Sequence, residues 1–416
     1  MNRTHPVSPA QFAFFRIVFG AYLAIHFATQ LPHAVELFSN QGVLSDPALN
    51  PLHGLFPNPL ALWDSPAFTL VFISSLLALS LAFTAGFFRR TASLLLWFGW
   101  AALFNRNNLI ANPSLPYVGL ILLFCALIPP GEPWSFRARR HAPSSWYFPG
   151  FVFWGAWLLL AAGYTASGII KLESPSWVNG TAFLHLLENP LARPGFVRDL
   201  LVAAPSSVHA ALTWFVLAME ILFLPLCAFR TGRLVAWSSM LAMHIGILTT
   251  VDFADLSFGM VMIHLFTFDP RWFPARRDAR QPVLLFDGEC GLCNAAVRLL
   301  LREDTTARLR FAPLQSPLGQ AYLRIQNLPT TDFDSLVFVP DWANPAVGDC
   351  RLRTDGALAA AAEIGGVWRA LSALRLLPRF LRDPIYKLVA RTRYALFGDY
   401  VPTPLPDPNW EHRFIA

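Results

Sequence analysis

The chain has 416 residues, of which 55% are hydrophobic and 14% charged, and its formal net charge is +6. Soluble domains carry about 25% charged residues, so this composition excludes an ordinary soluble protein over the whole length. Long stretches before residue 270 carry no charge, whereas residues 271–416 have the composition of a soluble domain. The sequence therefore predicts two domains that meet near residue 270.

Eight apolar segments precede residue 270, and a helix that crosses a bilayer needs about 20 such residues. They cover residues 9–29, 67–88, 91–109, 115–130, 150–170, 208–229, 233–250 and 256–269. The first is too long, and too polar at its end, for a cleaved signal peptide, so we expect it to be retained. Residues 1–270 are thus predicted to form a multi-pass α-helical membrane domain of about eight spans, with the lipid bilayer as its partner.

Lys and Arg residues in the connections predict the orientation of these spans. One set of connections holds Arg3, Arg89, Arg90, Arg137, Arg139, Arg140, Arg230, Arg233, Arg271, Arg276, Arg277 and Arg280. The other set holds only Arg106, Lys171, Arg193 and Arg198. This alternation predicts a bacterial inner-membrane protein with both termini in the cytoplasm. Because the flanking arginines account for most of the net charge, nucleic acid is not an expected partner.

The soluble part begins with an apolar run that ends at Asp287-Gly288 and is followed by Cys290 and Cys293. Cysteines at C-x-x-C spacing at a helix start lie at the positive end of the helix dipole, which stabilises a thiolate. Such a pair exchanges two electrons by closing and opening a disulfide. A zinc site normally needs four ligands, and this domain has only one further Cys and one His. We therefore favour a redox-active Cys290–Cys293 disulfide over a metal site.

Roles follow for the residues around this pair. We expect Cys290, at the helix start and more exposed, to be the attacking thiolate, and Cys293 to resolve the mixed disulfide. Asp287 is either a proton relay or a turn residue that precedes Gly288. Two further residues, Arg353 and Asp355, either support the site or hold their strand in place. No covalently bound cofactor is expected.

The pattern of residues 282–400 predicts a mixed sheet with helices packed on it. The expected strands are 283–287, 308–312, 335–340 and one near 350–353, and the expected helices are 291–303, 317–327 and 355–364. Residues 271–281 are interpreted as a linker and 401–416 as a tail. Residues 367–377 and 383–397 predict two basic amphipathic helices. These helices either lie on the membrane surface or present a solvated face while packed on the domain.

Polar groups at membrane depth are costly and are therefore functional candidates. This set comprises Arg106, Asn112, Lys171, Trp177, Glu220, His244 and His264. Lys171 ends an apolar helix, where a buried amine can act as a base. Alternatively, Lys171 reaches the interface and Trp177 belongs to an aromatic belt. Arg16 is expected to be a structural ion pair, with Glu220 as a candidate partner.

The block from Gly163 to Gly180, together with 219–225 and 244–260, resembles vitamin K-dependent γ-carboxylase and its bacterial relatives, the HTTM domains. The resemblance covers about residues 8–270. It implies that Lys171 matches the lysine that deprotonates vitamin K hydroquinone, and hence a quinone-like ligand. The carboxylases carry a histidine where this chain reads Asn112-Pro113-Ser114, and their large lumenal domain is absent, so we do not expect γ-carboxylation of glutamates.

Ordered motifs of the soluble part resemble the DCC family of thiol-disulfide oxidoreductases, named for Asp, Cys and Cys. They are Asp287-Gly288-x-Cys290-x-x-Cys293, Leu309–Gln315, Arg353–Ala357, Pro378, Arg382–Tyr386 and Arg393–Gly398. The resemblance covers about residues 282–400. It implies an α/β thioredoxin-like fold and exchange with protein thiols or disulfides.

Three functions remain open. The first, which we favour, is a membrane-anchored thiol-disulfide oxidoreductase of the protein-disulfide reductase type, whose membrane domain is an anchor or a quinone partner. The second is a membrane enzyme that acts on a quinone-like substrate through Lys171, with the soluble domain keeping it reduced. The third is a non-catalytic transport or scaffold protein.

Overall fold

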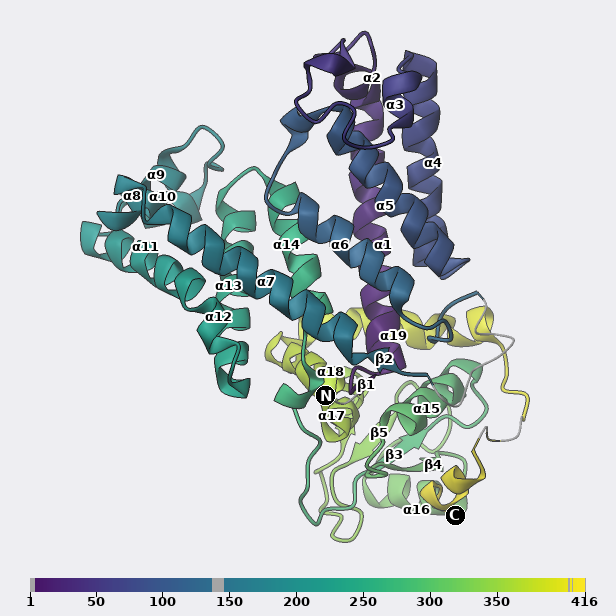
Figure 1. Cartoon of the computed structure of the whole chain (residues 1–416). Coiled ribbons are helices and arrows are strands. Elements are labelled where there is room, and N and C mark those ends of the chain that lie inside the picture. The colour runs from purple at the N-terminus through teal and green to yellow at the C-terminus, as the bar shows by residue number, and fades with distance from the viewer. Residues whose placement is uncertain (1–3, 137–145, 403–404, 406, 416) are drawn as a thin grey trace. The chain divides into compact units, whose positions relative to one another are not determined.

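The structure is a computed structural model, and it describes residues 4–136, 146–402, 405 and 407–415. The chain divides into two compact units, Met1–Phe268 and Asp269–Ala416, here called the N-terminal and the C-terminal unit (Figure 1). Part of the predicted orientation rests on Arg3, Arg137, Arg139 and Arg140, which lie outside the described residues.

The N-terminal unit is helical. Its longer helices are α1 (Pro9–Gln30), α4 (Pro66–Thr84), α5 (Arg89–Arg106), α6 (Leu115–Leu127), α7 (Gly150–Lys171), α11 (Ser206–Ile221), α13 (Arg230–Thr250) and α14 (Ala254–Phe266). Short helices connect them: α2 (Ala34–Phe38), α3 (Pro59–Leu62), α8 (Pro175–Val178), α9 (Ala182–Glu188), α10 (Phe196–Val202) and α12 (Phe223–Leu226). Strands β1 (Thr4–His5) and β2 (Phe148–Pro149) pair antiparallel. Each of the eight apolar segments therefore contains a helix.

Three of the described helical segments are long and apolar enough to cross a membrane: Pro9–Phe38, Pro66–Thr84 and Gly150–Lys171. A fourth is added if α10 and α11, which meet at an angle of 103°, form one broken span. Helices α6 and α14 have 13 residues each, and at about 1.5 Å per residue they are shorter than a bilayer core. The described residues thus give three to four candidate spans. The total of about eight spans in the N-terminal unit remains a prediction.

A buried ion cluster corrects the expected partner of Arg16. The side chain of Arg16 lies 3.4 Å from the carboxylate of Glu132, and Arg89 shares the same carboxylate at 2.9 Å. Glu132 follows α6, where the chain turns back towards these two arginines. Glu220 is instead bound by Lys171. A charge is buried only where a partner compensates its desolvation, and here two arginines share one acid.

The C-terminal unit is built on a four-stranded mixed sheet. Its strands are β3 (Val283–Phe286), β4 (Arg310–Pro313), β5 (Val337–Val339) and β6 (Arg351–Leu352), in the order β4-β3-β5-β6. Strand β3 is parallel to β4 and antiparallel to β5, and β5 is antiparallel to β6. The helices are α15 (Gly291–Glu303), α16 (Pro317–Ile325), α17 (Arg353–Ile364), α18 (Gly366–Leu371) and α19 (Arg379–Phe397). A mixed α/β domain with the predicted order of elements is therefore confirmed.

Strand β3 is central and buried on both faces. Alternate residues of a strand point to opposite faces. Leu284 and Phe286 accordingly pack with α15 and α17, through residues such as Val297 and Ala360. Val283 and Leu285 pack on the other face, where α16 contributes Tyr322 and Leu323. The loop that follows β3 therefore starts from the end of a buried inner strand.

Described residues of the segments interpreted as linker and tail contact this unit. Trp272 is buried, and the carbonyl of Phe273 accepts a hydrogen bond from Gly366 N–H at 2.5 Å. Near the C-terminus, the buried Arg413 pairs with the buried Asp304 at 2.5 Å. Single aromatic and charged anchors thus connect both segments to the domain.

Candidate functional site

The two cysteines lie where β3 passes through a short turn into α15. Cys290 occupies the N-cap position of α15, and its sulfur accepts a hydrogen bond from the Cys293 backbone N–H at 3.3 Å. Both are free thiols. Unpaired N–H groups and the helix dipole stabilise negative charge at this position. The expected placement of the pair at a helix start is therefore present.

The expectation that Cys290 is the more exposed cysteine is wrong. Cys290 is 0% exposed, whereas Cys293 is partly exposed. Residues 398–400, which follow α19 and are called the cover segment, pass over the start of α15. Gly398 C=O accepts from Gly291 N–H at 3.2 Å, and Tyr400 N–H donates to Glu289 C=O at 2.7 Å. Backbone hydrogen bonds on both sides of Cys290 thus hold the cover segment alongside this residue.

The environment of Cys293 disfavours its thiolate. Burial is the main reason that the pKa of the Cys293 thiol is raised, and the hydrogen bond to Cys290 and the charges of Cys290 and Asp287 raise it further. The guanidinium of Arg393 acts in the opposite direction and lowers this pKa. Cys293 is therefore a neutral thiol at neutral pH. The charges of Asp287 and Arg393 shift its pKa in opposite directions.

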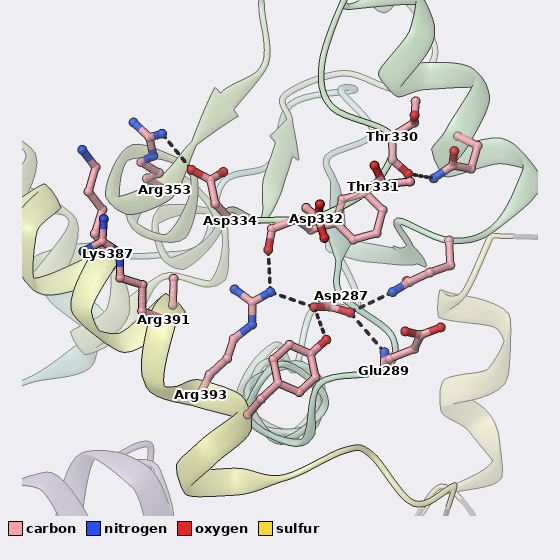
Figure 2. Close-up of a pocket in the computed structure, with 15 residues that line it drawn as sticks. Asp287, Glu289, Thr330, Thr331, Asp332, Asp334, Arg353, Lys387, Arg391 and Arg393 are labelled. Atoms are coloured by element: carbon pink, nitrogen blue, oxygen red, sulfur yellow. Dashed lines mark hydrogen bonds and ion pairs between the residues drawn. The ribbon is translucent and has the colours of Figure 1, made fainter.

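The carboxylate of Asp287 is the most heavily bonded group of the site (Figure 2). Its Oδ1 accepts from the Gln315 side chain at 2.8 Å and from Glu289 N–H at 3.2 Å. Its Oδ2 accepts from Arg393 at 2.8 Å and from the Tyr394 hydroxyl at 2.7 Å. Burial raises the pKa of Asp287, but these hydrogen bonds and the Arg393 charge outweigh burial and lower it. Asp287 is therefore ionised, with four donors on a group that offers about four acceptor sites.

Gln315 and Arg393 tie the turn to other elements. Gln315, just after β4, also accepts from Gly288 N–H through its side-chain oxygen at 3.0 Å. Arg393, on α19, is buried and also donates to the carbonyl of Phe333 at 2.5 Å. Reasoning from the residues alone missed Gln315, Arg393 and Tyr394. The only signal for them was their presence in the motifs of the DCC resemblance.

A cavity of about 830 Å³ opens beside Asp287 (Figure 2). Acidic and basic side chains face each other across it, among them Glu289, Asp334, Arg353, Lys387 and Arg393. Neither cysteine lines it. Asp287 and Arg393 lie at its wall, so the cavity gives solvent access to their ion pair.

The two residues expected to support the redox pair have separate roles. Arg353 lines the cavity and pairs with the exposed Asp334 at 2.9 Å. Asp355, at the start of α17, pairs with Arg382 at 2.6 Å and Arg379 at 2.7 Å. Asp355 therefore holds α19 on α17. Gly288 contributes its backbone N–H to Gln315, as described above.

The candidate polar set of the N-terminal unit divides into separate groups. Lys171 donates to both carboxylate oxygens of Glu220, at 2.5 and 2.6 Å, and lies 4.5 Å from the centre of the Trp177 ring. His244 meets the Tyr164 hydroxyl at 2.9 Å, and its ring lies 5.9 Å from that of His264. These are two neighbouring clusters on α7, α8, α11, α13 and α14.

Arg106 and Asn112 lie in other surroundings. Arg106 donates to the carbonyl of Leu44 at 2.7 Å. Asn112 donates to Asp255 at 3.0 Å, and Asp255 also contacts His26 at 2.8 Å and Tyr22 at 3.1 Å. Sequence reasoning missed Asp255, although it is an acid at the start of an apolar helix. Within the described ranges, no group of three or more His, Cys, Asp or Glu residues is placed to hold a metal ion.

Comparison with known proteins agrees with this division. Residues 4–272 match the HTTM domain family, and residues 284–399 match the family of DCC1-like thiol-disulfide oxidoreductases. The YuxK protein of Bacillus subtilis (strain 168) is 36% identical over 133 residues, which are 32% of this chain and 93% of that protein. A chloroplastic DCC family protein of Arabidopsis thaliana is 32% identical over 120 residues, 29% of this chain and 66% of that protein. No solved structure matches the chain.

Both resemblances noted in the sequence are thereby confirmed. The N-terminal match covers the helices that are able to span a membrane, and the C-terminal match contains Asp287, both cysteines and Arg393. The chain belongs to the HTTM domain family and carries a C-terminal DCC1-like thiol-disulfide oxidoreductase domain.

Proposed function

We propose that the protein is a membrane-anchored thiol-disulfide oxidoreductase that reduces disulfides with the Cys290–Cys293 pair. The observation that carries this proposal is the arrangement of two free thiols at the start of α15, with Cys293 N–H donating to the Cys290 sulfur. The sheet order β4-β3-β5-β6, with the cysteines after β3, supports a thioredoxin-like fold. The DCC1-like match supports the reaction class.

The reaction balances with the residues present. The Cys290 thiolate attacks one sulfur of a substrate disulfide, forms a mixed disulfide and releases one substrate thiolate. Cys293 then loses its proton and attacks the Cys290 sulfur, which closes the Cys290–Cys293 disulfide and releases the second substrate thiolate. Two electrons pass to the substrate, and its thiolates take up the two protons. An external thiol or dithiol must reduce the pair again.

Asp287 is proposed here as a positioning residue. A proton relay needs a free acceptor site, and four donors already occupy the Asp287 carboxylate. Its charge fixes the turn that carries Cys290 and the helix that carries Arg393. The proton of Cys293 therefore leaves through solvent or the substrate thiolate, since Cys293 is partly exposed.

Access to Cys290 requires movement of the cover segment in this proposal. Cys290 is fully buried, and residues 398–400 are bonded to the backbone on both sides of it. Gly398 allows the sharp change of direction after α19, because its φ of +66° suits glycine. Tyr400 anchors the segment through a 2.9 Å hydrogen bond from Arg298. Opening this short segment exposes the attacking sulfur without disturbing the sheet.

The first prediction concerns this access. In the reduced full-length protein, Cys290 should react with a small alkylating reagent more slowly than Cys293, because the cover segment shields it. Tyr400→Ala should accelerate alkylation of Cys290 several-fold, because it removes the anchor to Arg298. Mild oxidation should give a Cys290–Cys293 disulfide that dithiothreitol reverses. Peptide mass spectrometry after timed labelling measures all three.

The matched control for Tyr400→Ala is Val401→Ala, since the neighbouring Val401 side chain is 74% exposed. Val401→Ala should leave the labelling rate of Cys290 unchanged. If Cys290 is labelled rapidly in the unmodified protein, the cover segment does not shield it. Failure to form the disulfide contradicts the proposed function itself.

The second prediction uses the two charges near Cys293. Closure of the mixed disulfide needs the Cys293 thiolate, so its rate should rise with pH. Asp287 raises the pKa of Cys293 and Arg393 lowers it. Asp287→Asn should therefore move the pH–rate profile to lower pH, and Arg393→Gln should move it to higher pH. Release of a chromophoric thiol from a mixed disulfide on Cys290 reports this rate.

Lys387→Gln is the control for this pair, because Lys387 lines the same cavity and is exposed. Its profile should stay close to that of the unmodified protein. Shifts of both variants in the same direction show that loss of structure, and not charge, controls the rate. That outcome removes Asp287 and Arg393 from the proposed mechanism.

We also propose that both termini lie in the cytoplasm of a bacterial inner membrane, on the basis of the arginine alternation. The cytoplasm is reducing, which keeps such a pair available for exchange. A reporter active only in the periplasm should be inactive when fused after residue 416. The same reporter should be active when inserted in the loop at residues 39–58. The reverse pattern contradicts this orientation.

A second candidate function rests on the cluster of Lys171, Glu220 and Trp177. An acid and an amine in contact within an apolar unit can exchange protons with a lipid-soluble, quinone-like substrate. In this proposal Lys171 is the base and Glu220 its proton partner. The C-terminal unit then supplies or removes electrons through its cysteines. The ion pair also allows a purely structural role, and a conservative substitution distinguishes the two.

The corresponding prediction is that Lys171→Arg preserves the fold but abolishes quinone-dependent turnover. Arginine keeps a cation beside Glu220, but it cannot give up its proton usefully. Expression and melting temperature should stay near those of the unmodified protein. Turnover of an added quinone by protein in detergent measures the effect. Surviving turnover in Lys171→Arg leaves Lys171 with a structural role only.

A further inference from the structure

Helix α19 turns its charged side towards the C-terminal unit. Arg382 pairs with Asp355 at 2.6 Å, and Arg393 pairs with Asp287 at 2.8 Å. Between them, the Tyr386 hydroxyl accepts from Leu336 N–H at 3.1 Å. These positions recur at spacings of 4, 7 and 11 residues, so they share one side of the helix. The usual arrangement, in which a surface helix packs its apolar side on the core, is reversed.

A neighbouring side of α19 is apolar and exposed. This apolar stripe consists of Leu381, Ile385, Leu388, Val389 and Leu396, which are exposed by 53%, 67%, 64%, 44% and 72%. Spacings of 3, 4, 7 and 8 residues place them on a single face. Phe380 adds a 73% exposed ring at the start of the helix. Contiguous apolar surface of this kind marks an interaction site.

Basic side chains flank the apolar stripe. Lys387 and Arg391 are exposed and four residues apart, next to the stripe on the side where both also line the cavity beside Asp287. Residues 379–397 contain five Lys or Arg residues and one acid, Asp383. That acid accepts a hydrogen bond from Thr354. The exposed charge beside the stripe is therefore positive.

We propose that α19 lies on the bilayer surface, with the apolar stripe in the acyl boundary and Lys387 and Arg391 on anionic headgroups. An apolar face bordered by basic residues fits an anionic lipid surface. The same chain carries helices able to span a membrane, so the C-terminal unit is tethered near lipid. A second copy of the protein is a poor partner for the stripe, because the basic residues beside the two stripes would repel each other.

Docking of α19 also has a consequence for the cysteines. The cover segment follows α19 directly, and Arg393 of the same helix binds Asp287. A helix held on lipid therefore fixes both the ion pair beside Cys293 and the origin of the segment over Cys290. This inference does not depend on the proposed disulfide chemistry, because it rests on exposed residues of α19 that do not contact the cysteines.

The test uses the full-length protein in lipid nanodiscs with an environment-sensitive fluorescent amino acid at position 388. A second sample carries the same residue at Val347, a 75% exposed position in the loop before β6. Lipids brominated in their acyl chains quench a fluorophore that enters the membrane. We expect strong quenching at position 388 and little at 347. Adding phosphatidylglycerol to phosphatidylcholine should increase the quenching at 388 at least two-fold.

The charge-reversed double variant Lys387→Glu/Arg391→Glu should abolish this phosphatidylglycerol dependence. Absence of quenching at position 388 in both lipids overturns the proposal. If its emission is nevertheless shifted to the blue, protein covers the stripe instead, from a second copy or from elsewhere in the chain. Equal quenching at 388 and 347 also overturns it, since contact with lipid is then not specific to α19.

Discussion

The carboxylate of Asp287 holds the C-terminal unit together at its candidate site. It joins the turn after β3, the residue that follows β4 and the last turns of α19, which are far apart in the sequence. Each of these segments also contributes to the surroundings of the cysteines. Removing one partner of a buried ion pair costs about 3–5 kcal/mol, so loss of this carboxylate is expected to affect the whole site.

The same ion pair sets the electrostatics of Cys293. Asp287 and Arg393 act on the pKa of this thiol with opposite signs, so their effects partly cancel. Burial then decides the direction, and the pKa of the Cys293 thiol is raised. In the proposed mechanism, a neutral Cys293 beside a helix-capping Cys290 leaves Cys290 as the first sulfur to attack.

Local features of the fold were predictable because neighbouring residues determine them. The strands of the C-terminal unit, the helix that starts at the cysteines and the two families followed from apolar periodicity and ordered motifs. The exposure of Cys290 was not predictable, because the cover segment comes from more than a hundred residues later in the chain. The partner of Arg16 was not predictable for the same reason, because Glu132 is more than a hundred residues away in the sequence.

The pattern of α19 predicted an amphipathic helix but not which side faces inward. Hydrophobicity alone would turn Leu381, Ile385 and Leu388 to the core. Two acids at helix and strand ends, Asp355 and Asp287, attract Arg382 and Arg393 instead, and the orientation of the helix follows these ion pairs. A soluble domain gains nothing from exposing such a face to water. In a chain that carries its own membrane helices, the same orientation supplies a lipid-facing surface and positions the cover segment with one element.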